Sequence, residues 1–215
     1  MLFDLDGTLL DTAPDLAFAL NQVRSEQGLA PLPYAEIRPR VSHGGSALVE
    51  FGFGLSAAEP EFAPLRQRLL DIYRNNLSRE TRLFPGMPEV LQSIEQRGMN
   101  WGVVTNKPAY LTEPLLQALN LYDRAACVIS GDTLEQRKPH AAPMLIACQQ
   151  AGSKVVQCVY VGDAQRDVEA GRNAGMRTLV AMFGYCTAED KPDTWGADAL
   201  IYEPADVLHW LDQQP

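Results

Sequence analysis

The chain has 215 residues, of which 46% are hydrophobic, and a formal net charge of -9 at pH 7. A chain of this size and apolar content can bury one sizeable core together with a smaller unit. The acidic charge argues against nucleic acid and anionic membranes as main partners, and no apolar run approaches the roughly 20 residues of a membrane span.

The chain begins with a short apolar strand, Leu2–Phe3, which runs into Asp4, Asp6 and a turn at Gly7. Beyond this turn the spacing of apolar residues predicts helices and no strand as far as residue 79. The predicted helices cover residues 15–27, 46–51 and 61–76. Residues 38–45 are polar and contain glycine, and within them residues 41–45 are predicted to be a loop. This segment is therefore expected to be a small all-helical insert.

From residue 84 onward, short apolar strands alternate with helices. The predicted strands are 101–104, 126–129, 158–161, 178–182 and 199–202, and the predicted helices are 88–97, 109–119, 141–151, 167–174 and 204–211. This alternation predicts a mainly parallel sheet covered on both faces. The expected fold is a Rossmann-like α/β core, residues 1–12 and 82–215, with an inserted all-helical domain, residues 13–81.

The cysteines Cys127, Cys148, Cys158 and Cys186 are scattered and form no CxxC pair. This pattern predicts free thiols rather than disulfides or a zinc site. Because the chain enters a strand and an acidic pair directly, we expect no signal peptide. These features predict a cytoplasmic protein, and they do not indicate its oligomeric state.

Asp4 and Asp6 are one residue apart at the carboxyl end of the first strand, so they point to the same side. Open α/β sheets bind their ligands at this edge. Two carboxylates this close repel each other, and a divalent cation or a proton on one of them relieves the repulsion. The pair is therefore typical of phosphoryl transfer by an aspartate nucleophile, although a polar turn without chemistry explains it equally well by itself.

Further polar residues follow later strands. They are Thr105 and Asn106, Lys138 between a strand and a helix, and Asp163 with Asp167 four residues on. Each has an ordinary explanation as a helix cap, a turn residue or a solvated charge. Together they supply carboxylates for a metal, a hydroxyl and amides for phosphate oxygens, and a lysine for charge.

DLDGT, Thr105 in VVTN, Lys138 in KP and Asp163 in VGDAQRD resemble, in order, the four motifs of the haloacid dehalogenase (HAD) superfamily. The resemblance covers essentially the whole chain, and the insert resembles the helical cap of that family. The TNKP form, the cap type and the length are most similar to the phosphoglycolate phosphatase group. Residues 184–198, with WGAD, are also similar to relatives that dephosphorylate N-acetylmuramic acid 6-phosphate. His140 departs from the third motif, and we expect it to alter only the local surface.

The resemblance implies a phosphatase that hydrolyses a small-molecule phosphate ester through an aspartyl-phosphate. In this scheme Asp4 is the nucleophile, and Asp6 protonates the leaving alkoxide and then accepts a proton from water. Mg²⁺ would be held by Asp4, the backbone carbonyl of Asp6 and Asp163, with Asp167 in support.

The phosphoryl oxygens would be bound by Thr105 and the amide of Asn106, while Lys138 neutralises charge. A dehalogenase of the same fold lacks the second aspartate, so Asp6 disfavours it. A phosphomutase of the β-phosphoglucomutase type shares every core motif and stays an alternative. A non-enzymatic binding module would lack the nucleophile or a metal ligand, and none is missing here.

The physiological substrate is not readable from these motifs, because they bind only the phosphate. We expect 2-phosphoglycolate or N-acetylmuramic acid 6-phosphate, with the cap contacting the rest of the molecule. The candidate contacts are Ser42, His43, Gly44 and Gly45, because glycines let amides approach a ligand and the other two offer a hydroxyl and an imidazole. A plain connection between helices explains the same residues equally well.

Overall fold

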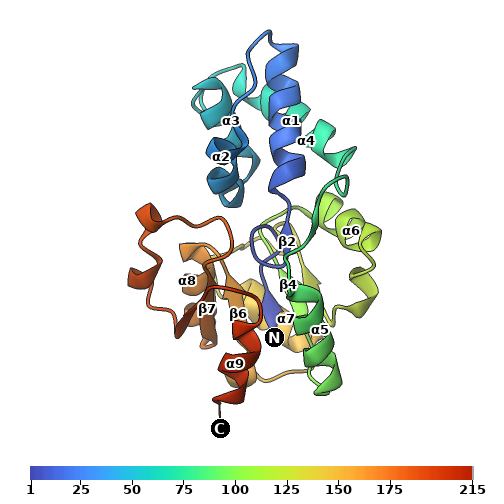
Figure 1. The fold of residues 1–215 in the computed structure, drawn as a ribbon, viewed down its shortest axis with the longest axis vertical. Coiled ribbons are helices and arrows are strands. Elements are labelled where there is room, and N and C mark those ends of the chain that lie inside the picture. Colours follow the sequence, from blue (N-terminus) through green and yellow to red (C-terminus); the bar gives the residue numbers. More distant parts are fainter. Residues whose placement is uncertain (215) are drawn as a thin grey trace.

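The computed structural model describes residues 1–214, and at its centre is a six-stranded parallel sheet (Figure 1). The strand order is β5-β4-β1-β6-β7-β8. The strands are β1 (Leu2–Phe3), β4 (Gly102–Val104), β5 (Val128–Ile129), β6 (Val159–Gly162), β7 (Arg177–Ala181) and β8 (Ala199–Ile201). Strand β1 lies between β4 and β6, with Leu2 in register with Gly102 and Tyr160. The predicted parallel α/β core is confirmed.

Successive side chains of each strand point to opposite faces of the sheet, and helices bury both faces. One face carries Leu2, Val104 and Tyr160 and is covered by α7 (Ala142–Gln150) and α8 (Gln165–Ala174). The other face carries Phe3, Val103 and their neighbours. It shares a core with apolar residues of α5 (Met87–Gln96), α6 (Ala109–Ala118) and α9 (Asp206–Asp212). Covering both faces leaves the carboxyl edge of the strands as the accessible place for a site.

Four helices form a separate group beyond this edge of the sheet (Figure 1). They are α1 (Ala13–Glu26), α2 (Tyr34–Ile37), α3 (Gly44–Phe53) and α4 (Phe62–Arg74). Apolar residues three and four apart, such as Leu16, Leu20 and Val23 of α1, lie buried within this group. The buried cluster that they belong to continues into one face of the sheet, so the helical group rests directly on the core.

Two chain segments join the helical group to the sheet, and they pair as a short antiparallel ribbon of β2 (Leu10–Asp11) and β3 (Arg82–Leu83). The fully buried Asp15 braces this junction. Its carboxylate accepts bonds from the backbone N–H of Glu80 at 3.0 Å, and from the N–H and hydroxyl of Thr81 at 2.9 and 2.8 Å. The sequence analysis did not predict this ribbon, because two-residue strands carry no readable alternation.

The prediction of a loop over residues 41–45 is wrong. Arg38–His43 form a 3₁₀ helix with Pro39 in its first turn, and Gly44 and Gly45 open α3. Gly44 has a φ of +82°, a value that glycine adopts without steric cost. This change of backbone conformation separates the 3₁₀ helix from the α-helix that follows. Among residues 1–214, no helix is both long and apolar enough to cross a membrane.

Candidate active site

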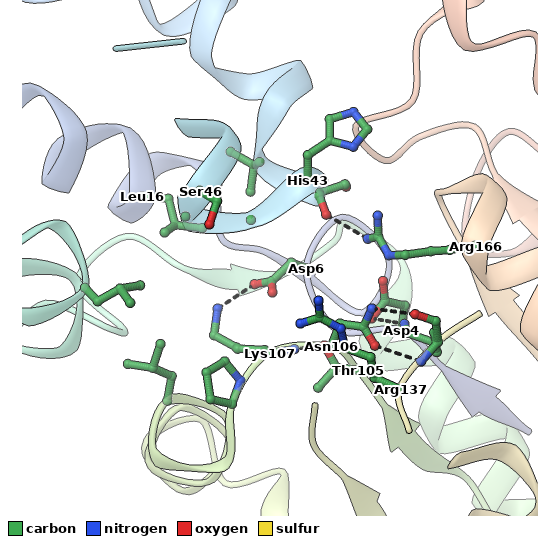
Figure 2. Close-up of a pocket in the computed structure, with 18 of the residues that line it drawn as sticks. Asp4, Asp6, Leu16, His43, Ser46, Thr105, Asn106, Lys107, Arg137 and Arg166 are labelled. Carbon is green, nitrogen blue, oxygen red and sulfur yellow. Dashed lines mark hydrogen bonds and ion pairs between the residues drawn. The ribbon is translucent and has the colours of Figure 1, made fainter. Parts of the chain in front are cut away.

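A cavity of about 510 Å³ lies where the helical group meets the carboxyl edge of the sheet (Figure 2). The sheet side supplies Asp4, Asp6, Thr105, Asn106, Lys107 and Lys138. The opposite wall is built from the start of α3 and from one face of α4. Residues that are distant in the sequence therefore share one enclosure, as expected at the end of a parallel sheet.

Asp4 lies at the floor of the cavity, immediately after β1, and is almost fully buried. One of its carboxylate oxygens is 2.8 Å from the ammonium of Lys138 and also accepts a bond from the N–H of Leu5 at 2.8 Å. Burial by itself would raise the pKa of Asp4, but the charges of Lys138 and then Arg166 outweigh it and lower the pKa. Asp4 is thus held as a fixed anion, the state that a nucleophilic carboxylate requires.

Lys138 is the cation of this cluster, and it is buried together with its partners. Its ammonium also lies 2.8 Å from Asp167 and donates to the hydroxyl of Tyr160 at 2.8 Å. The side chain of Asn106 exchanges two hydrogen bonds with the backbone of Lys138, at 3.0 and 3.1 Å. The side chain of Asn106 therefore positions the lysine.

Asp4, Asp163 and Asp167 form a buried acidic cluster in which one oxygen from each lies within 4.8 Å of the others. Burial, and then the charges of Asp4 and Asp167, raise the pKa of Asp163 to about 7. The Oδ1 atom of Asp163 is buried and has no hydrogen-bond partner within the described residues. Buried carboxylate oxygens without a partner are what a hard divalent cation binds, so these residues fit a Mg²⁺ site.

Gly7 makes room for this cluster. It adopts a φ of +84°, and a Cβ at this position would overlap the carboxylate of Asp163. The turn after Asp6 thus brings the backbone of the first motif against the fourth motif, and no larger residue fits there.

Asp6 lies on the sheet side of the cavity, where its carboxylate is held by two donors. Figure 2 shows Lys107 pointing at Asp6, and the ammonium is 2.8 Å from the Oδ1 atom. The hydroxyl of Thr12 donates to the same oxygen at 2.6 Å. Lys107 also donates to the hydroxyl of Tyr73, on α4, at 2.9 Å. A residue of the helical group is thus linked through Lys107 to the second aspartate of the first motif.

Thr105 follows β4 directly and lines the cavity beside Asn106 (Figure 2). Its N–H donates to the carbonyl of Ile129 at 2.9 Å, which continues the pairing of β4 with β5. Its hydroxyl accepts the N–H of Lys107 at 3.1 Å and is still able to donate. All the core residues predicted from the motifs are therefore brought together at one edge of the sheet.

Ser42, His43, Gly44 and Gly45 of the helical group all line the cavity, but the hydroxyl of Ser42 is directed at Asp163. It donates to Asp163 at 2.6 Å, while the carbonyl of Ser42 accepts from Arg166 at 2.7 Å. The exposed His43 has its ring turned away from Asp4 and Asp6 (Figure 2). His140 is also exposed, and its ring accepts the N–H of Ala142 at 3.2 Å, outside the cavity lining.

The sequence analysis missed several residues of the site. They are Tyr73, Lys107, Arg166, Arg66 and Tyr185, whose backbone N–H donates to Asp163 at 2.9 Å. Lys107 is adjacent to Thr105 and Asn106, so its position in TNKP was a usable signal. Arg66, Tyr73 and Arg166 carried none, because a polar residue on an amphipathic helix looks the same whether it faces water or a cavity. Tyr185 carried none either, because it lies in an irregular segment after β7 that has no periodic pattern.

The family is settled by comparison with known proteins. A family model described as haloacid dehalogenase-like hydrolase matches residues 1–181. This is most of the chain, so the protein belongs to the haloacid dehalogenase-like hydrolase family.

The relatives carry two different names. The chain is 41% identical to an N-acetylmuramic acid 6-phosphate phosphatase of Pseudomonas aeruginosa, over 99% of this chain and 94% of that protein. It is 45% identical to a phosphoglycolate phosphatase of Xanthomonas campestris, over 95% of this chain and 92% of that protein. A crystal structure of a predicted phosphoglycolate phosphatase from Haemophilus somnus matches with a TM-score of 0.82 at 28% identity, covering 98% of this chain and 96% of that one.

Proposed function

We propose that this protein is a Mg²⁺-dependent phosphatase that hydrolyses a small phosphorylated metabolite through an aspartyl-phosphate on Asp4. The reaction class is that of its family relatives, and the chain is a phosphomonoesterase. The two relatives suggest 2-phosphoglycolate or N-acetylmuramic acid 6-phosphate as the substrate. The mechanism rests chiefly on the pairing of the buried Asp4 with Lys138 at 2.8 Å, beside the acidic cluster.

In this proposal Asp4 attacks phosphorus, and the alkoxide of the substrate leaves from the opposite side. Lys138 lies beside the attacking carboxylate and is placed to neutralise charge on the phosphoryl group. The hydroxyl of Thr105 and the backbone N–H of Asn106 would donate hydrogen bonds to the phosphoryl oxygens. The aspartyl-phosphate is then hydrolysed by water, which restores Asp4.

Asp6 is proposed to move the protons. Both of its donors, Lys107 and Thr12, bind Oδ1, which leaves Oδ2 to carry the transferred proton. Asp6 protonates the leaving alkoxide in the first step and accepts a proton from the attacking water in the second. General acid–base help of this kind typically contributes about 10² to 10⁴ in rate.

A Mg²⁺ ion would be held by the carboxylates of Asp4 and Asp163 and by the backbone carbonyl of Asp6, with Asp167 supporting the site. Asp167 already shares Lys138 with Asp4, so it also fixes the position of the lysine. When bound, the ion would neutralise the negative charge that builds up on the phosphoryl oxygens.

We also propose that residues 13–81 act as a cap domain on a core of residues 1–12 and 82–215. Several hydrogen bonds join these parts. They include Ser42 with Asp163, Tyr73 with Lys107, and Arg38 with the carbonyl of Gly184 at 2.9 Å, and in this proposal they form when the cap closes. Closure would exclude water that is not meant to react.

The test is release of inorganic phosphate from p-nitrophenyl phosphate with Mg²⁺, with and without excess EDTA. We expect turnover with Mg²⁺ and its loss with EDTA. Quenching the reaction and reducing the protein with borohydride should mark Asp4, because an acyl phosphate is reduced where a free carboxylate is not. Turnover that persists in EDTA, or a label on another residue, would contradict the proposed mechanism.

The substrate is tested with a panel of phosphate esters that includes 2-phosphoglycolate and N-acetylmuramic acid 6-phosphate. Comparison of kcat/KM identifies the preferred ester, since this ratio measures stabilisation of the transition state. A glucose phosphate converted to its isomer without release of phosphate would favour the phosphomutase alternative.

A further inference from the structure

The lining of the cavity carries more cationic than anionic side chains. Within the described residues, two carboxylates line the cavity, Asp4 and Asp6, and both lie on the sheet side. The cationic side chains are Arg66, Lys107, Arg137, Lys138 and Arg166. In a chain with a formal net charge of -9, this local excess of positive charge marks the cavity as a place for an anionic ligand.

Most of these cations already have partners. Lys138 is paired with Asp4 and Asp167, and Lys107 is paired with Asp6. Arg166 donates to the carbonyl of Ser42 and lies close to the acidic cluster. Their charges are therefore largely committed to the phosphate end of the site, where they offset the carboxylates.

Arg66 and Arg137 form no ion pair within the described residues, but Arg137 is exposed to solvent, whereas Arg66 is partly buried. Its Nε atom is buried and has no hydrogen-bond partner, and no carboxylate within residues 1–214 forms an ion pair with its guanidinium. A buried donor without an acceptor costs about 1–3 kcal/mol, and more when it is charged. The cost is removed when a ligand supplies the acceptor.

The position of Arg66 on α4 directs it into the cavity. Arg66, Leu70 and Tyr73 are spaced at i, i+4 and i+7, so they share one helical face, and all three line the cavity. Leu70 packs closely against Gly45 at the start of α3. Ser46, the next residue, lies on the cap side above Asp6 with its hydroxyl turned toward the cavity (Figure 2).

We propose that Arg66 is a specificity-determining residue that binds a carboxylate on the leaving alcohol of the substrate. This inference rests on the proposed phosphatase function and adds to it the chemical class of the leaving group. The planar guanidinium offers two parallel N–H donors, which match the two oxygens of a carboxylate. An ester whose leaving group carries this charge gains a contact at the cap wall, and a neutral ester does not.

The experiment compares esters with and without a carboxylate on the leaving group. One pair is 2-phosphoglycolate and its neutral amide, 2-phosphoglycolamide, which differ only in the charged group. A second, less closely matched pair is N-acetylmuramic acid 6-phosphate and N-acetylglucosamine 6-phosphate, which lacks the whole lactyl ether and with it the carboxylate. We expect Arg66→Gln to lower kcat/KM about 10- to 100-fold for the preferred carboxylate ester. It should change kcat/KM less than about threefold for the neutral partner and for p-nitrophenyl phosphate.

Two further variants separate recognition from stability. Arg66→Lys keeps the positive charge but loses the two parallel N–H donors of the guanidinium. It should therefore retain only part of the preference for the carboxylate ester. Arg68→Gln removes a surface arginine of the same helix, which pairs with Glu26, and should leave every kcat/KM ratio unchanged. A thermal melt within a few degrees of the wild type would show that each variant is folded.

An equal loss with the acid and the neutral ester, or no loss with either, would overturn the assignment of Arg66. If the wild-type protein hydrolysed none of the esters, the proposed function would fail instead. Calorimetric binding of 2-phosphoglycolate and 2-phosphoglycolamide would then decide the inference by itself. A loss of affinity in Arg66→Gln confined to the acid would sustain it, and equal affinities in both proteins would refute it.

Discussion

The hydroxyl of Tyr73 links the helical group through Lys107 to Asp6, the proposed general acid, so we expect Tyr73→Phe to slow the enzyme without unfolding it. The side chain is fully buried, and its hydroxyl accepts a bond from the ammonium of Lys107 at 2.9 Å. Burial raises the pKa of Tyr73 to about 12, so the phenol stays neutral and acts as the acceptor. The substitution removes this one oxygen and keeps the ring, whose centroid lies 4.5 Å from the same ammonium.

The size of the loss follows from the single hydrogen bond between Lys107 and Tyr73. A hydrogen bond to a charged group contributes about 1.5–3 kcal/mol, which corresponds to about one to two decades in kcat/KM. Lys107 would also hold Asp6 less firmly. The loss should therefore be larger for alkyl phosphates, whose leaving group needs a proton, than for p-nitrophenyl phosphate.

The assay is steady-state kinetics with an alkyl phosphate and p-nitrophenyl phosphate, together with a thermal melt. Tyr110→Phe is the matched control, because Tyr110 is 41% exposed and lies outside the cavity lining. Wild-type kinetics in Tyr73→Phe with both esters would refute the coupling. A loss that is equal for both esters would leave a role in closure and remove the role in positioning Asp6.

Four other variants follow from the site and the junction. Asp4→Asn should abolish turnover while the far-UV circular dichroism spectrum stays native. Activity that persists in this variant, once deamidation back to Asp has been excluded, would contradict a nucleophilic Asp4. Asp6→Asn should still bind Mg²⁺ in a titration, because its proposed metal contact is a backbone carbonyl, but should lose more activity with poor leaving groups than with p-nitrophenolate. Asp15→Ala should lower the free energy of unfolding by at least about 3 kcal/mol in urea, because the N–H and hydroxyl of Thr81 lose their acceptor; a change below about 1 kcal/mol would contradict the brace. Ser42→Ala should lower kcat/KM with every ester alike, since its hydroxyl binds Asp163, and a loss confined to one leaving group would instead support substrate contact.

Much of the core site could be predicted because its residues are encoded locally. Asp4 and Asp6 follow a strand within three residues, and Thr105 and Asp163 follow strands in the same way. Parallel strands end at one edge, so a polar residue just past each strand is brought to the same place without any knowledge of side-chain packing. The periods of two and 3.6 residues were likewise enough to place the strands and the main helices.

Other features depended on contacts between distant segments. The ribbon of β2 and β3 has no sequence pattern, and it forms because Asp15 holds residues 80 and 81 beside the start of α1. Residues 41–45 were expected to be a loop, because the polarity of this stretch hides a 3₁₀ helix over residues 38–43 that packs against α1, α2 and α3.

The amino-acid sequence by itself determined the α/β core, the helical insert and the carboxylates, hydroxyl and lysine of the four motifs, since each depends on a local pattern. Only the tertiary structure decided what faces those groups. In the tertiary structure the hydroxyl of Tyr73 accepts a hydrogen bond from Lys107, and the hydroxyl of Ser42 donates one to Asp163. Arg66 lines the cavity, and its Nε atom has no hydrogen-bond partner within the described residues. The reason is that the faces of α3 and α4 are assigned by packing of the whole helical group on the sheet, and no short stretch of sequence encodes that packing.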